Sequence, residues 1–157
     1  MPDMLVNLYN LPSAGELTGR LDKEGVRIIR AMTPNKRLVC DWIGKKFAAG
    51  WASECEAAFC HFPVSCFAAV KGDEIIGFAC YDATMKGYFG PMGVDPDARE
   101  HGVGTALLLN CLEAMKNEGY GYAVIGGAGP VDFYRKACGA TVIDGSSPNI
   151  YTNLLRG

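Results

Sequence analysis

The chain has 157 residues, enough for one domain with a buried core and too few for two ordinary domains. Hydrophobic residues make up 49% of it and charged residues 20%, a balance typical of a globular protein and not of a disordered one. The 15 basic and 17 acidic residues give a net charge of −2, so nucleic acid is not an expected partner.

The cysteines and the start of the chain set expectations about compartment and metal binding. Cysteines stand at positions 40, 55, 60, 66, 80, 111 and 138, without a Cys-x-x-Cys pair and mostly among apolar neighbours. This usage is typical of a reducing cytoplasm, where thiols act as small hydrophobic groups. A zinc site that includes His61 and Cys60 is the alternative, but the ligand spacing is absent, so we predict no metal. No apolar run approaches the roughly 18 residues of a membrane helix, and the start lacks a secretory signal, so we expect no membrane contact.

Hydrophobic periodicity and turn residues predict helices and strands in a definite order. The predicted elements are a strand at 4–9, a helix at 16–24, a strand at 26–32, helices from 33 and at 51–60, strands at 65–70, 74–81 and 87–94, a helix at 102–118, a strand at 122–125, a helix at 131–137, and closing strands at 140–143 and 150–154. Pro91 indicates a bulge or splay in its strand, because proline cannot donate to a ladder. The order predicts an α/β (α+β) fold, with a mixed, mostly antiparallel sheet flanked by helices and one β-α-β stretch.

A glycine-containing loop leads from the strand that ends at Val94 into the longest predicted helix. It reads Arg99-Glu100-His101-Gly102-Val103-Gly104-Thr105. The N–H groups at a helix start lack internal partners and carry partial positive charge, and glycines let several of them converge on one anion. The loop therefore predicts a phosphate cradle, to which Arg99 adds a fixed charge. The alternative is a turn that only caps the helix. A dinucleotide fingerprint at 126–129 is disfavoured, because Asp132 stands where its third glycine belongs.

These residues resemble the GNAT superfamily of Gcn5-related N-acetyltransferases. Residues 99–104 match its R/Q-x-x-G-x-G/A motif, Gly93-Val94-Asp95-Pro96 matches the strand end and turn before it, and residues 133–140 resemble its later F-Y-x-x-x-G segment. The resemblance covers roughly residues 26–155. It implies one GNAT domain at 26–157 with a sheet splayed at its centre, and an N-terminal extension at 1–25 that packs on the domain.

The resemblance also implies acetyl-CoA as co-substrate, without a metal. The pantetheine arm would pair with the backbone of the strand at 87–94, and the pyrophosphate would rest on the N–H groups of the loop. Tyr134 would touch the cofactor and protonate the departing thiolate, although a purely structural aromatic is the alternative. Gly127 stands where the family often has an asparagine that contacts the cofactor. The implied cofactor-binding residues are Met92, Gly93, Val94, Arg99, Glu100, His101, Gly102, Val103, Gly104, Thr105, Gly127 and Tyr134.

A general base is harder to assign. Asp82, and then Glu54 and Glu56, are the candidate carboxylates, and an ordinary solvated carboxylate is the alternative for each. Trp51 is a candidate floor for the acceptor pocket, and a core tryptophan is the alternative. The resemblance implies acetyl transfer to an amine of a small molecule or peptide by direct attack in a ternary complex. A non-catalytic acyl-CoA-binding sensor and a generic nucleotide-binding domain are alternatives. The acceptor is not identified by the sequence, and a homodimer is an option it leaves open.

Overall fold

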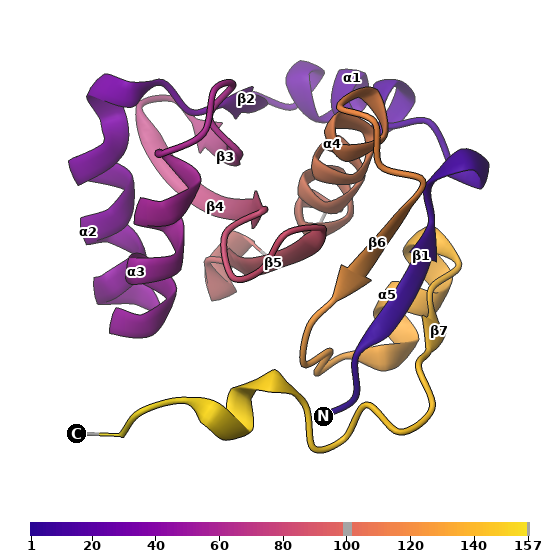
Figure 1. Ribbon diagram of the computed structural model, residues 1–157. Coiled ribbons are helices and arrows are strands. Elements are labelled where there is room, and N and C mark those ends of the chain that lie inside the picture. The colour runs from indigo at the N-terminus through magenta and orange to yellow at the C-terminus, as the bar shows by residue number, and fades with distance from the viewer. Residues whose placement is uncertain (99–101, 157) are drawn as a thin grey trace.

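The computed structural model describes residues 1–98 and 102–156. These residues form one seven-stranded sheet in the order β2-β3-β4-β5-β6-β1-β7 (Figure 1). Only the β5–β6 pair is parallel; the other neighbouring strands are antiparallel. The strands are β1 (Met4–Asn7), β2 (Val26–Arg30), β3 (Cys66–Lys71), β4 (Glu74–Tyr81), β5 (Tyr88–Val94), β6 (Tyr122–Ile125) and β7 (Thr141–Val142). The predicted mostly antiparallel α/β sheet with one β-α-β stretch is confirmed.

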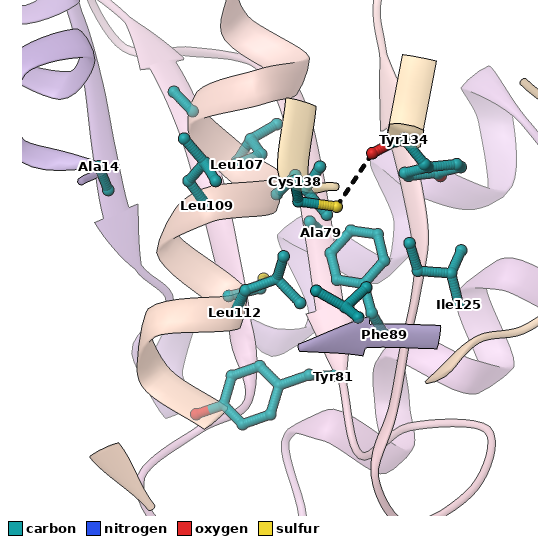
Figure 2. Packing of buried hydrophobic residues seen from close by; sticks show 14 of the residues in the cluster. Ala14, Ala79, Tyr81, Phe89, Leu107, Leu109, Leu112, Ile125, Tyr134 and Cys138 are labelled. Atoms are coloured by element: carbon teal, nitrogen blue, oxygen red, sulfur yellow. Dashed lines mark hydrogen bonds between the residues drawn. The ribbon is translucent and has the colours of Figure 1, made fainter. Parts of the chain in front are cut away.

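Helices cover both faces of the sheet and give two hydrophobic clusters. The α-helices are α1 (Gly15–Lys23), α2 (Lys36–Lys46), α3 (Ala49–Ala58), α4 (Val103–Asn117) and α5 (Val131–Cys138). Along β4, Ala79 and Tyr81 belong to the cluster with α4 and α5 (Figure 2), whereas Phe78 and Cys80 belong to the cluster with α2 and α3. This alternation is the period of two expected for a strand that is buried on both faces. None of the helices in the described ranges is long and apolar enough to cross a membrane.

The N-terminal segment contributes a strand to the interior of the sheet. Met4 of β1 lies opposite Ile125 of β6 on one side and Val142 of β7 on the other, and its side chain is fully buried. Helix α1 then packs against β2 and α4. Residues 1–25 are therefore integrated into the folded unit, although the proposed domain boundary at residue 26 stays a prediction.

The end of the chain differs from the sequence-based prediction. The strand predicted at 150–154 is wrong: Ile150–Asn153 is a short 3₁₀ helix, and Asn149 caps it by accepting a hydrogen bond from the Tyr151 amide at 3.0 Å. The strand predicted at 140–143 is reduced to β7. Strand β1 takes the sheet position beside β6, and β7 is the last strand of the sheet. The Asn149 cap starts a helical turn where the strand was predicted. The segment after β7 instead runs across the molecule toward α3 (Figure 1).

Candidate active site

The parallel pair β5–β6 separates shortly after it forms. Its register contains only Tyr88 opposite Val124 and Phe89 opposite Ile125, where β6 ends. Strand β5 continues to Val94 and stays paired with β4 on its other side. Among the described residues, residues 90–93 therefore have no strand partner on the β6 side. This split at the centre of the sheet, visible in Figure 1, is the splay that Pro91 indicated.

An aromatic wall from α2 and α3 lies on one face of the split strand. Gly93 of β5 is buried, and a Cβ atom built on it would lie only 2.6–2.8 Å from three ring atoms of Phe47. Phe47 in turn packs against Trp42, Trp51 and Phe78, with ring centroids 5.4–5.7 Å away. Because Gly93 has no side chain, the Phe47 ring packs directly against the backbone of β5. Trp51, the predicted pocket floor, belongs to this wall.

The loop that follows β5 delivers the chain to the start of α4. Gly102 is the residue before the helix, with φ +83° and ψ +18°, a left-handed conformation that favours glycine. Gly102 has no side chain to cap the helix, and the first turn contains no acidic residue, so the first-turn amides of Val103, Gly104 and Thr105 are suited to an external anion. Arg99, Glu100 and His101 lie outside the described residues.

The structure brings a second basic residue to this helix start. A Cβ atom on Gly102 would lie 3.2 Å from Nη2 of Arg20 and 3.3 Å from Cδ1 of Leu17, both on α1. Arg20 also forms an exposed ion pair with Glu24 at 3.0 Å. Sequence reasoning missed Arg20, because an i,i+4 pair with a glutamate reads as an ordinary solvated helix face.

Tyr134 lies at the base of the split. It is 8% exposed, and its ring meets Phe89, the last residue of β5 that pairs with β6, edge-on with the ring centroids 6.3 Å apart (Figure 2). The Tyr134 hydroxyl has no hydrogen-bond partner among the described residues. In the same residues, every fully buried side-chain oxygen has a hydrogen-bond partner. The hydroxyl must therefore be reachable from outside the protein. Burial, reinforced by Cys138, raises the pKa of Tyr134 to about 12, so the phenol keeps its proton at neutral pH.

Asp82 is engaged by its own surroundings. It has φ +52°, and its carboxylate accepts hydrogen bonds from the Gly87 amide at 2.7 Å and from the Tyr120 hydroxyl at 2.9 Å. These contacts hold the connection between β4 and β5 together. Its catalytic role stays a prediction, and the contacts supply a structural reason for the carboxylate.

Glu54 lies in a polar cluster near the end of β6. Its carboxylate accepts a hydrogen bond from the Thr84 hydroxyl, and Tyr151 of the C-terminal segment lies close enough to interact electrostatically with both side chains. A Cβ on Gly126, the residue after β6, would lie 3.6 Å from the Tyr151 hydroxyl. Helix α3, the β4–β5 connection and the C-terminal segment therefore converge here. Glu56, in contrast, is exposed. Sequence reasoning missed Thr84 and Tyr151, the latter because it was assigned to a strand.

Gly127 is surrounded by the protein itself. Its amide donates to Oδ1 of Asp3 at 2.8 Å, and a Cβ on it would lie 3.2 Å from the Tyr151 ring and 3.4 Å from Asn149. The lack of a side chain at Gly127 thus allows Tyr151 and Asn149 of the C-terminal segment to pack close to its backbone. Its predicted cofactor contact stays a prediction.

Comparison with known proteins gives an independent view of the fold and family. The model of the acetyltransferase (GNAT) family matches residues 36–140. The GCN5-related glucosamine N-acetyltransferase region of a fungal multi-domain GH3 β-N-acetylglucosaminidase has a TM-score of 0.73, at 13% identity over 90% of this chain and 19% of that one. A GCN5-related N-acetyltransferase from Sphaerobacter thermophilus has a TM-score of 0.66, at 21% identity over 90% of this chain and 48% of that one.

A smaller protein is similar over most of its own length. An aminoglycoside acetyltransferase from an uncultured soil metagenomic sample, solved with trehalose, has a TM-score of 0.54 at 16% identity, over 73% of this chain and 88% of that one. The chain spans less than half the length of the fungal and Sphaerobacter proteins. At these identities, likeness to solved structures shows the fold alone. A search among curated proteins found no match.

Proposed function

Since the chain belongs to the GNAT acetyltransferase family, we propose that it transfers an acetyl group from acetyl-CoA to an amine of a small molecule or peptide by direct attack in a ternary complex. The observation that carries this proposal is the split between β5 and β6 with the unpaired Tyr134 hydroxyl at its base. A bound thioester in that split would lie between the protonated phenol of Tyr134 and the aromatic wall, and the acceptor would approach along that wall.

The residues around the split suit this ligand. The amides that follow Gly102 would hold the pyrophosphate, together with the loop at 99–101, and the Arg20 guanidinium adds positive charge nearby. The backbone of β5 around Met92, on the side away from β4, would pair with the amides of the pantetheine arm, as an added strand would. Acetyl-CoA supplies the acetyl group as a thioester, so transfer forms a C–N bond and breaks the C–S bond.

Tyr134 and Glu54 divide the proton transfers. Tyr134 holds a proton at Oη, which it donates to the leaving sulfur; its raised pKa of about 12 keeps that proton in place. Glu54 removes the proton that the acceptor amine must lose. We choose it over Asp82, the other half-buried candidate, because Asp82 is held by both the Gly87 amide and the Tyr120 hydroxyl, whereas Glu54 accepts from the Thr84 hydroxyl. The cluster that Glu54 forms with Thr84 and Tyr151 would border the acceptor.

Replacement of Tyr134 by phenylalanine tests the acid. Loss of one hydroxyl removes the proton donor and leaves the ring packing intact, so kcat should fall about 100-fold or more while the Kd for coenzyme A stays within about threefold. Turnover is measured by thiol release and binding by isothermal titration. Tyr122→Phe, at an exposed tyrosine of β6, is the matched control. An unchanged kcat in Tyr134→Phe would remove this residue from the role.

Replacement of Glu54 by glutamine tests the base. The variant should lower kcat/KM by about tenfold or more at neutral pH, and the deficit should shrink as pH rises and the acceptor amine loses its proton unaided. Glu16→Gln, at an exposed residue of α1, serves as the control. A deficit that is the same at every pH would contradict the assignment.

An acceptor screen tests the reaction itself. Amino sugars come first, because two similar structures are described as a glucosamine N-acetyltransferase region and an aminoglycoside acetyltransferase; amino acids, other amines and peptides follow. Coenzyme A binding without turnover on any acceptor would favour the alternative, a non-catalytic acyl-CoA sensor. Tight ATP or NAD binding without coenzyme A binding would overturn both.

A further inference from the structure

Three buried thiols meet in the core on the α2–α3 side of the sheet. Cys55 comes from α3, Cys66 from β3 and Cys80 from β4, and all three are fully buried. Their sulfur atoms lie within 4.8 Å of one another, and the Cys55 and Cys66 sulfurs are 3.8 Å apart. The transfer reaction uses none of them. Because three different elements supply them, no short sequence motif marks the group.

The spacing of the sulfurs suits a single thiophilic ion. In a tetrahedral zinc–thiolate site with Zn–S bonds of about 2.3 Å, neighbouring sulfurs are about 3.8 Å apart. An equilateral triangle with the upper-limit side of 4.8 Å has its centre about 2.8 Å from each sulfur. Inward shifts of about half an ångström for each sulfur therefore complete three metal–sulfur bonds.

A fourth cysteine connects this group to solvent. Cys40 of α2 is buried in the same hydrophobic cluster as the three thiols, and its sulfur interacts electrostatically with that of Cys55. It also lines a surface hollow of about 660 Å³ between α2 and α3, whose charged residues are Lys36, Arg37, Asp41 and Glu56. The Cys40 sulfur is not one of those that lie within 4.8 Å of one another, so it would move toward the ion to become a fourth ligand. Its place in the lining of the hollow gives an ion a route to the buried sulfurs.

The polar contact inside this group runs from sulfur to sulfur. The Cys55 thiol donates to the Cys66 sulfur. An ion at the centre replaces this S–H···S contact by metal–sulfur bonds.

We infer that Cys55, Cys66 and Cys80, with Cys40 as the fourth ligand, bind one thiophilic d¹⁰ cation, Zn²⁺ or Cu⁺. Soft thiolates favour these two ions. Each ligating sulfur releases its proton to solvent, so Zn²⁺ carries a net charge of −1 with the three core thiolates, and of −2 once the Cys40 thiolate also binds. The ion would link α3, which also carries Glu54, to β3 and β4.

Titration of the reduced full chain with Zn²⁺, and separately with Cu⁺, against a chromophoric chelator tests the site. The wild-type protein should bind one equivalent of at least one of these ions, release protons in weakly buffered solution, and melt several degrees higher with the ion than after chelation. The two arms show which ion the site takes. A folded, reduced wild-type chain that binds neither ion would overturn the inference, whatever the variants do.

Alanine variants locate the ion. Cys66→Ala and Cys40→Ala should abolish or weaken the one-equivalent binding, whereas Cys111→Ala, at an equally buried thiol of α4 in the other cluster, should retain it. Circular dichroism checks that each variant is folded, and Cys40 at the rim is the substitution least disruptive to the core. Equal binding by Cys66→Ala and wild type would refute the assignment of the ligands.

Discussion

Replacement of Gly93 by alanine measures how tightly the aromatic wall of α2 and α3 is packed onto β5. The added Cβ would lie 2.6–2.8 Å from three atoms of the Phe47 ring, where ordinary contact is 3.4–4 Å. The ring cannot swing away freely, because Trp42, Trp51 and Phe78 surround it. Overpacking of this kind costs about 1–3 kcal/mol of unfolding free energy.

A double-mutant cycle assigns that cost to the contact with Phe47. In a Phe47→Leu background the ring is gone, and Gly93→Ala should cost less than about 0.5 kcal/mol, or stabilise slightly by restricting the unfolded chain. The coupling free energy between the two sites should therefore be about 1 kcal/mol or more. Urea denaturation of the wild type, both single variants and the double variant provides the four values.

The control is a glycine with open space around it. A Cβ atom on Gly121 would meet no atom within 4 Å, and the φ of this residue is not left-handed, so Gly121→Ala should be neutral or mildly stabilising. If Gly93→Ala is as destabilising in the Phe47→Leu background as in the wild type, the reasoning from the aromatic contact is refuted.

Two further predictions concern the cofactor loop and alkaline pH. Arg20→Gln should raise the Kd for coenzyme A about three- to tenfold, the size of one half-exposed charge contact, whereas Arg27→Gln on the exposed side of β2 should not; equal values in isothermal titration would remove Arg20 from the site. Burial raises the pKa of the Cys111 thiol above its ordinary value of 9.0. The unfolded chain therefore loses this proton first, so stability is fully present below pH 9 and declines above it by up to about 1.4 kcal/mol per pH unit for this one group. Denaturant unfolding of wild type and Cys111→Ala between pH 8 and about 10.5 should show the steeper decline in wild type, and parallel curves would contradict it.

The order of elements through the centre of the chain was predictable from local pattern. The helix predicted at 102–118 is observed as α4, and the strands flanking it are observed as β5 and β6, because periodicity and turn residues act over a few positions. The left-handed Gly102 follows from the same local logic. Pro91 indicated the split correctly, since a residue without an N–H disturbs the ladder wherever it stands.

Pairings between distant parts of the chain were not predictable in this way. The contact of Asp3 with Gly127 joins residues 124 positions apart, and β1 takes its place beside β6 through the same long-range pairing. No local pattern encodes which strand lies beside β6. The strand predicted at 150–154 was wrong, because this segment forms a short 3₁₀ helix outside the sheet. The C-terminal segment instead brings Tyr151 to Gly127.

The sequence by itself determined the family resemblance, the helix start that suits an anion, and Tyr134 as the candidate acid. Those features depend on residue type and short spacing. Only the tertiary structure decided that Arg20 lies at Gly102, that Asp82 is held by the β4–β5 connection, and that cysteines from α3, β3 and β4 meet in the core. Each of these depends on which elements pack together, and that choice is made by burial summed over the whole domain.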